Sequence, residues 1–227
     1  MPAAGVGRRL GTPGAKALVP LAGRPLLAHA LAALAANRCV TAVVVVAHPR
    51  ALDATGALLA DEGFAKLATV VAGGPTRQAS VASGLEALPP GPAYVAVHDA
   101  ARPLVEPGEV DRLLGLLEGD PERPAGVVPG VPVVDTVRRV GEGGRSGGVV
   151  DRQALRAVQT PQLFVRQVLE EAHRAAALAG VDATDEAALV ELAGHPVRVV
   201  PGSAENLKVT TVLDLVVAEA ILARRSR

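Results

Sequence analysis

The sequence predicts an α/β fold in which a mostly parallel, twisted sheet carries helices on both faces and a β-hairpin arm projects from the body. Three observations lead to this fold class. Short apolar runs alternate along the chain with longer segments rich in Ala and Leu. Several runs are apolar throughout, as strands covered on both faces are. A single glycine-rich stretch, residues 131–152, interrupts the alternation, which is otherwise typical of βα units.

The predicted strands are the continuous apolar runs at residues 41–47, 67–72, 94–97, 126–129 and 197–201. The predicted helices repeat apolar residues at helical spacing and cover residues 25–37, 50–62, 76–88, 107–117, 165–179, 184–193 and 211–223. Ligands of such sheets bind at the carboxyl ends of the strands. Residues that follow a strand are therefore the first candidates for a site.

The glycine-rich stretch predicts a β-arm. Residues 131–152 contain two short extended runs around a turn rich in glycine, residues 141–148. Two strands alone are barely stable in water, so we expect the arm to pack on a second subunit; a mobile surface loop is the alternative. The whole chain, residues 1–227, is expected to form one domain of ordinary size.

Composition narrows the classes of function. The formal net charge is zero and there is no long basic run, which disfavours a nucleic-acid partner. No apolar run reaches the roughly eighteen residues of a membrane span, so no membrane partner is expected. The single cysteine, Cys39, excludes an internal disulfide. We expect a buried Cys39 and a cytoplasmic protein.

Lysine is rare in this chain, and its positions are informative. Only three of the 23 Lys and Arg residues are lysines, and Lys16 follows Arg9 and a loop of small residues, 3–7. Small residues let backbone N–H groups approach a phosphate closely. The planar guanidinium of Arg can bind two phosphate oxygens at once, and the ammonium group of Lys is a compact point charge. The segment predicts a triphosphate site; a plain strand-to-helix turn is the alternative.

The strand predicted at 94–97 is followed by His98 and Asp99. Asp99 would place a carboxylate at the carboxyl edge of the sheet, where a hard cation bridging phosphate oxygens could be held directly or through water. The alternative is that Asp99 caps the turn that follows the strand. Arg102, three residues further on, can reach the same edge of the sheet. We expect His98 to be a structural residue rather than a base.

Two other loops precede predicted helices. Gly73 and Gly74 follow a predicted strand and precede Arg77 and Ser80, which repeats the loop-to-helix pattern but is also ordinary turn chemistry. Thr184 stands at the start of the helix predicted at 184–193. We expect its hydroxyl to cap that helix unless a ligand is near.

Taken in order, these segments resemble the 2-C-methyl-D-erythritol 4-phosphate cytidylyltransferase family. The motifs are PAAGVGRR (2–9), Lys16, GG-x-x-R-x-x-S (73–80), VHDAARP (97–103), DT (135–136), DR (151–152), TPQ-x-F (160–164), TDEA (184–187) and EN-x-KVT (205–210). The resemblance implies a Rossmann-like nucleotidyltransferase fold and a homodimer that exchanges β-arms. It also implies transfer of CMP from CTP to methylerythritol phosphate, with release of pyrophosphate, in the non-mevalonate pathway of isoprenoid biosynthesis.

The resemblance implies roles for individual residues. The catalytic residues would be Arg9, Lys16, Arg152 and Lys208, of which the first two stabilise the pentavalent α-phosphorus. CTP would be bound by Ala3, Ala4, Gly5, Gly7, Gly73, Gly74, Arg77 and Ser80, and Mg²⁺ by Asp99. The acceptor would be positioned by Asp99, Ala100, Arg102, Thr136, Thr160 and Thr184, with Thr136 reaching across the dimer.

Two departures from the family pattern lie beside Lys16. Only Met1 precedes the PAAG motif, which begins at Pro2, so we expect the strand that leads into it to be missing: either the true start lies upstream or the loop is poorly held. Ala15 stands where relatives commonly have Pro. The alternatives are a cytidylyltransferase for another alcohol phosphate, such as ribitol 5-phosphate, and a catalytically impaired CTP-binding homologue.

Overall fold

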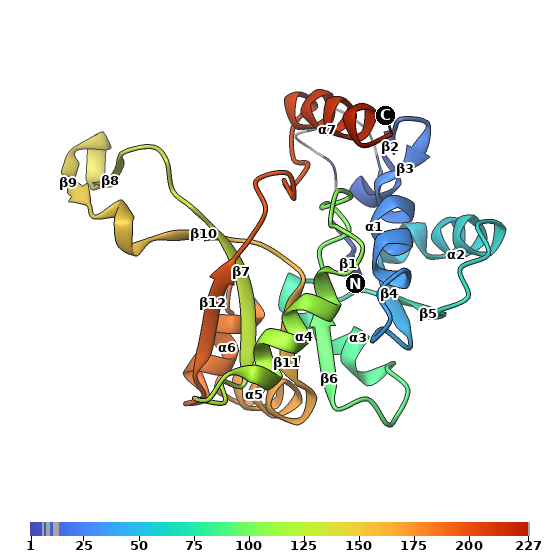
Figure 1. The fold of residues 1–227 in the computed structure, drawn as a ribbon, viewed down its shortest axis with the longest axis horizontal. Helices are drawn as coiled ribbons and strands as arrows, with labels where there is room; N and C mark the ends of the chain where they lie inside the picture. Colours follow the sequence, from blue (N-terminus) through green and yellow to red (C-terminus); the bar gives the residue numbers. More distant parts are fainter. Residues whose placement is uncertain (6, 8–9, 11–13, 227) are drawn as a thin grey trace.

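In the computed structural model, which describes residues 1–5, 7, 10 and 14–226, the strands of the body form two groups (Figure 1). The first group is parallel and has the order β1 (Pro2–Ala3), β4 (Val43–Ala47), β5 (Leu67–Ala72). All five residues of β4 are buried. This explains its unbroken apolar sequence, because both faces of the strand are covered.

The second group is built around β7 (Gly126–Pro132). On one side β7 pairs in parallel with β12 (Val197–Pro201); on the other it pairs antiparallel with β10 (Arg156–Val158) and β11 (Gln162–Val165). β11 also pairs antiparallel with β6 (Tyr94–Val97). Strands β6, β7 and β12 therefore share one direction. A short antiparallel strand, which periodicity did not predict, lies between β6 and β7.

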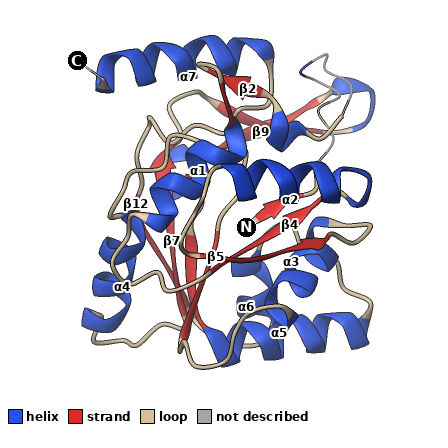
Figure 2. Cartoon of the chain, turned by 90° about the vertical axis from the view of Figure 1, so that its right-hand side faces the viewer, coloured by secondary structure: helices blue, strands red, loops and turns tan. Residues whose placement is uncertain are grey.

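Helices cover both faces of the strands (Figure 2). Their bounds are α1 (Leu26–Ala35), α2 (Leu52–Asp61), α3 (Arg77–Glu86), α4 (Glu109–Gly119), α5 (Arg166–Ala179), α6 (Glu186–Leu192) and α7 (Val212–Arg225). Adjacent residues of β7 show the two layers: Val127 packs with α4, whereas Val128 packs with α3, α5 and α6. A small antiparallel pair, β2 (Pro20–Leu21) and β3 (Arg24–Pro25), precedes α1.

Every predicted strand and helix is present, with ends shifted by a few residues. Two local expectations were wrong. The N-cap of α6 is Asp185, whose carboxylate accepts the Ala188 N–H at 3.0 Å, so Thr184 is not the cap. Cys39 is exposed beyond the end of α1, where its backbone N–H donates to the carboxylate of Asp111.

The predicted hairpin is confirmed. Strands β8 (Val137–Val140) and β9 (Ser146–Val150) pair antiparallel and project from the body (Figure 1). Gly143 and Gly144, at φ 65° and 77°, supply the left-handed backbone that the turn needs. Val134, Val140 and Val149 remain exposed on or beside this β-arm.

The expected loss of the first strand is only partly correct. β1 has two residues, yet it is bonded on both sides: Val46 N–H donates to Met1 O at 3.0 Å, and Ala100 N–H donates to Pro2 O at 3.1 Å. These bonds place β1 between β4 and the end of β6. Met1 and Pro2 are therefore anchored to the sheet by their backbone carbonyls.

Beside this short strand lies an apolar cavity of about 430 Å³. Its walls come from β4, β6, β11 and the neighbouring helices and include Leu34, Val44, Val97 and Leu163. The Met1 ammonium group reaches into this region and donates to Val44 O at 2.6 Å. Burial lowers the pKa of this ammonium group to about 5. The cavity, which we call the strand slot, occupies the level of the sheet where β1 is too short to reach.

Candidate active site

A pocket of about 1170 Å³ opens at the carboxyl ends of β1, β4, β5 and β6. Residues just after each of these strands line it, namely 4–5, 48–51, 73–77 and 99–101. Gly14 to Ala17, Ser80 and Lys208 complete the wall. The edge of the sheet at which ligands were predicted to bind therefore carries the pocket, which is large enough for a nucleotide.

The pocket is strongly cationic. Among the described residues that line it, Lys16, Arg50, Arg77 and Lys208 are cations, and Asp99 is the one acid. A cleft with this excess of positive charge attracts polyanions. The charge is local, because the chain as a whole has a formal net charge of zero.

Small residues let two loops meet at the base of the pocket. A side chain at Gly73 would bring its Cβ within 2.8 Å of both Ala4 Cβ and Ser80 Oγ. A Cβ at Gly74 would lie 2.6 Å from Ala79 Cβ. Glycine is thus required at both positions by close approach of neighbouring atoms, and neither position has positive φ.

Backbone hydrogen bonds join Lys16 to the segment that follows β1. Its N–H donates to Gly5 O at 3.0 Å, and Gly7 N–H donates to Gly14 O at 3.3 Å. These bonds bring Lys16, the first residue of a 3-10 helix, beside Gly5 in the pocket wall. Gly7 is not among the lining residues, and Arg9 lies outside the described residues.

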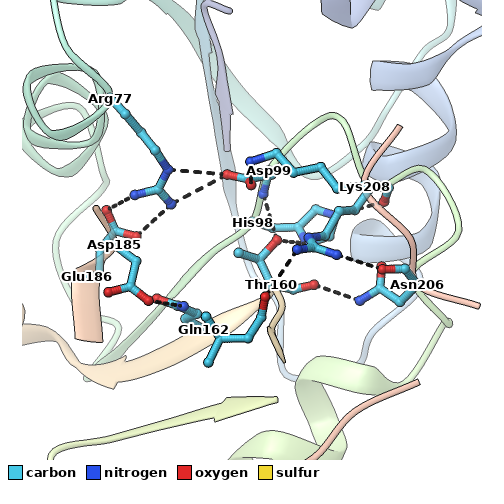
Figure 3. A network of polar contacts seen from close by, with 11 residues as sticks. Arg77, His98, Asp99, Thr160, Gln162, Asp185, Glu186, Asn206 and Lys208 are labelled. Atoms are coloured by element: carbon cyan, nitrogen blue, oxygen red, sulfur yellow. Dashed lines mark hydrogen bonds and ion pairs between the residues drawn. The ribbon is translucent and has the colours of Figure 1, made fainter. Parts of the chain in front are cut away.

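Asp99 forms the polar centre of the site (Figure 3). Its Oδ2 lies 2.6 Å from Lys208 Nζ, and its Oδ1 lies 3.4 Å from the Arg77 guanidinium. Burial opposes ionisation of this carboxyl, but Lys208 and Arg77 outweigh burial and lower the pKa of Asp99 to about 2. Its side chain binds cations instead of capping a turn; only its backbone carbonyl accepts the Arg102 N–H.

Thr160 and His98 support Asp99 from behind. The Thr160 hydroxyl accepts the Asp99 N–H at 3.0 Å and lies 3.1 Å from His98 Nδ1. His98 Nε2 lies 3.1 Å from Arg102 O, which can only accept, so the proton resides on Nε2 and Nδ1 accepts from Thr160. Burial lowers the pKa of His98 to about 4. His98 is therefore a neutral structural residue, as expected.

The model of the family described as IspD, 2-C-methyl-D-erythritol 4-phosphate cytidylyltransferase, matches residues 1–224. The chain belongs to this cytidylyltransferase family. A relative of that name from Streptomyces coelicolor is 47% identical over 99% of this chain and 84% of its own length. One from Synechocystis sp. is 39% identical over 100% of this chain and 96% of its own.

Solved structures give the same result. The crystal structure of 2-C-methyl-D-erythritol 4-phosphate cytidylyltransferase from Thermus thermophilus is 42% identical and matches with a TM-score of 0.76, covering 92% of this chain and 94% of that one. Membership of the cytidylyltransferase family confirms the predicted Rossmann-like nucleotidyltransferase fold.

The pocket gathers most, but not all, of the residues predicted for a cytidylyltransferase site. It brings together Ala3, Ala4, Gly5, Lys16, Gly73, Gly74, Arg77, Ser80, Asp99, Ala100 and Lys208. Thr136 and Arg152 belong to the β-arm, where Arg152 donates to the Val134 carbonyl. Thr184 is exposed before α6, and Thr160 is buried behind Asp99. None of these four threonine and arginine residues lines the pocket of its own chain.

Arg102 lies beside the pocket without lining it. Its Nη1 donates to Asn206 O at 2.7 Å and its Nη2 to Val158 O at 3.3 Å. Asn206 in turn donates to Thr160 O at 2.8 Å. Arg102 thus ties the segment that carries Lys208 to the sheet.

Sequence reasoning missed two charged residues of the site. Arg50 lines the pocket three residues after β4, so the rule that ligands bind after strands could have found it. Glu186 is buried, and both its oxygens accept from Arg77 at 2.7 and 2.8 Å. Its only signal in the sequence is an acid in the TDEA motif at the start of an apolar helix.

Among the described residues, no cluster of three or more His, Cys, Asp or Glu side chains could hold a metal ion by itself. In the same part of the chain, no helix is long and apolar enough to cross a membrane.

Proposed function

We propose that this chain transfers CMP from CTP to 2-C-methyl-D-erythritol 4-phosphate, giving 4-diphosphocytidyl-2-C-methyl-D-erythritol and pyrophosphate. One observation supports this most directly: the large pocket at four strand ends has Lys16, Arg50, Arg77 and Lys208 against the single acid Asp99 among its described lining residues. Two phosphorylated substrates need such an excess of cations. Family membership favours CTP and methylerythritol phosphate as those substrates.

The proposed reaction needs no general base. A phosphate oxygen of the acceptor forms a bond to the α-phosphorus of CTP, and the bond from that phosphorus to the bridging β-phosphate oxygen breaks, releasing pyrophosphate. A phosphate monoester is already largely dianionic near neutral pH. Catalysis therefore consists of aligning two polyanions and stabilising the equatorial oxygens of the transition state. The neutral, internally bonded His98 agrees with this chemistry.

The small-residue base of the pocket is the proposed CTP site. Ala3, Ala4, Gly5, Gly73, Gly74 and Ser80 would lie against the nucleotide, with Gly7 and Arg77 nearby. The close contacts at Gly73 support a backbone surface that a ligand can approach. Lys16, together with Arg9, would stabilise the charge that develops on the α-phosphate, because an ammonium group can follow a phosphoryl group through its transition state.

Asp99 is the proposed ligand of Mg²⁺. It is ionised, its side chain is 11% exposed, and it is the one acid among the described lining residues. This donor set fits Mg²⁺, which is usually bound by one or two carboxylates together with substrate phosphates and water. When bound, the ion would neutralise charge on the phosphate oxygens.

The acceptor site would be completed by a second subunit. Lys208, Ala100 and Arg102 would form its near side, with Thr160 and Thr184 further along the same edge. Thr136 and Arg152 belong to the β-arm and lie outside the pocket of their own chain, and the arm leaves apolar side chains exposed. Both features support a homodimer in which each arm reaches the partner's pocket. A cytoplasmic location and the lack of a nucleic-acid partner stay predictions.

A pyrophosphate-release assay tests the function. We expect release from CTP with Mg²⁺ only when methylerythritol phosphate is present, and a product with the mass of the diphosphocytidyl compound. Faster release with ribitol 5-phosphate would assign another acceptor. Binding of CTP without turnover by folded protein would indicate the impaired homologue instead.

A further inference from the structure

We propose that Glu186 is a positioning residue, whose buried carboxylate fixes the Arg77 guanidinium so that Asp99 is presented to the pocket in one orientation. The proposal deepens the proposed function and rests on it for the role of Asp99. The contacts that carry it are shown in Figure 3.

Glu186 and Arg77 form a two-pronged ion pair between the first turns of α6 and α3. Arg77 Nη1 donates to Glu186 Oε1 at 2.7 Å, and Nη2 donates to Oε2 at 2.8 Å. Because both carboxylate oxygens accept, the carboxyl group is ionised. The Glu186 side chain is 1% exposed and does not line the pocket, whereas Arg77 is 28% exposed and does. Glu186 therefore acts on the pocket only through another residue.

The other side of the guanidinium faces Asp99. Arg77 Nε and Nη2 both lie 3.4 Å from Asp99 Oδ1, clearly longer than the contacts to Glu186. The shorter pair determines where the guanidinium lies. Asp99 consequently keeps Oδ2 on Lys208 at 2.6 Å and has only a loose contact at Oδ1.

Charge alternates along this line of residues. Glu186 is negative, Arg77 positive, Asp99 negative and Lys208 positive, so each inner group lies between two groups of opposite sign. Without the negative charge of Glu186, the nearest remaining carboxylate for Arg77 is Asp99. The guanidinium would then close on Asp99 and compete with Lys208 and with a bound cation.

Glu186 lies on a helix whose neighbouring residues are buried in the apolar core. Its neighbours on α6, Ala187, Leu189 and Val190, belong to the main apolar core. An ionised carboxylate in such a layer carries a desolvation penalty that its attraction to Arg77 offsets only with good geometry. An apolar side chain at this position would fill the same space without that penalty. The role of this carboxylate is therefore to orient Arg77.

The first test compares Glu186→Gln with Glu191→Gln, the same change at an exposed position of the same helix. We expect Glu186→Gln to lower kcat roughly 10- to 100-fold, the range found when a residue that orients a ligand group is removed, and to raise the Mg²⁺ concentration needed for half-maximal rate. The KM for CTP should change far less. Glu191→Gln should match wild type. Wild-type kcat and Mg²⁺ dependence in folded Glu186→Gln would overturn the proposal.

A double-mutant cycle separates positioning from a general structural effect. If Glu186 acts through Arg77, adding Glu186→Gln to Arg77→Gln should cause no further loss of kcat. Losses that multiply in the double variant would contradict the proposal. Should Glu186→Gln fail to fold, Arg77→Lys tests the same ion pair through its other member. Lysine keeps the positive charge but cannot donate two parallel hydrogen bonds to Glu186. Wild-type kcat in folded Arg77→Lys would also refute the role.

An NMR measurement is independent of turnover. In protein with ¹⁵N-labelled arginine, we expect the guanidinium signal assigned to Arg77 to show slowed rotation and separate Nη resonances, lost in Glu186→Gln and retained in Glu191→Gln. If wild type shows this signal but no turnover, the proposed function fails while the pairing stands. If turnover is present and the signal is absent, Glu186 does not hold Arg77 and the positioning role is overturned.

Discussion

Lys208 Nζ lies 2.6 Å from Asp99 Oδ2, joining the segment before α7 to the end of β6. The contact brings one of the three lysines of the chain to the one acid among the described residues of the pocket wall. The positive charge of Lys208 contributes more than any other group to keeping Asp99 ionised despite its burial.

Removing Lys208 should raise the pKa of Asp99. In Lys208→Gln we expect the pKa to move up from about 2 towards the value set by burial, because the nearest compensating charge is lost. Carboxyl ¹³C NMR measures this titration. The folded-state pKa of Asp99 in wild type lies below that of an unfolded Asp, so the stability it contributes is present above about pH 4 and lost towards pH 2. An unchanged pKa would show that Lys208 does not contact Asp99 in solution.

Lys16→Ala should lower kcat by roughly 10², or about 3 kcal/mol, with a smaller change in the KM for CTP. The reason is that an ammonium group at the α-phosphate interacts most strongly with the charge of the transition state. Lys66→Ala is the control, since Lys66 Nζ donates to Asn37 O instead of lining the pocket. Its turnover should equal that of wild type, and an intact rate in Lys16→Ala would exclude the catalytic role.

Arg152→Ala should raise the KM for the acceptor and leave CTP binding largely unchanged, because Arg152 lies outside the pocket of its own chain. If the residue acts across a dimer, mixing Arg152→Ala protein with Lys16→Ala protein restores one intact pocket per mixed dimer. At an acceptor concentration far below the KM of the Arg152→Ala protein, random exchange of subunits should then recover about a quarter of wild-type turnover. If the mixture is no more active than either variant protein alone, Arg152 acts in the pocket of its own chain.

Stability should fall as the pH drops from 6.5 to 4 because of His98. Its folded-state pKa is about 4, so in this window the unfolded chain binds a proton that the folded chain does not. His173, with a pKa lowered to about 4 by burial, acts in the same direction. His98→Asn should therefore reduce the slope of unfolding free energy against pH by up to about 1.4 kcal/mol per unit. Urea titrations at several pH values measure it, and an unchanged slope would mean that folding does not lower the pKa of His98.

The strand slot should accept additional chain at Met1. An extension of four β-branched residues would continue the pairing with β4 into the apolar cavity of about 430 Å³, and would replace the buried ammonium by a peptide bond. Burying two such side chains should stabilise the fold by about 3 kcal/mol or more. A Gly-Ser extension of equal length is the control. Equal melting temperatures for the two proteins would show that the slot is not filled.

Much of the fold could be predicted from local patterns. The runs of valine at 43–46 and the glycines of the β-arm turn determine their own backbone conformation. By contrast, β11 is four residues long, and its antiparallel direction depends on β6 and β7. Such a strand has too little periodicity of its own to be found in the sequence.

The candidate site divides in the same way. Motif order, small loops and residues after strands indicated Lys16, Gly73, Asp99 and Lys208, because those signals lie in neighbouring residues or in the whole ordered set. The sequence by itself thus determined the helices, the long strands, the family resemblance and most of the pocket. Only the tertiary structure decided that β1 keeps two bonded residues, that Thr160 stands behind Asp99, and that Glu186 holds Arg77 from 109 residues away. Those features are contacts between distant segments, and their energies depend on burial and geometry that arise only when the chain has folded.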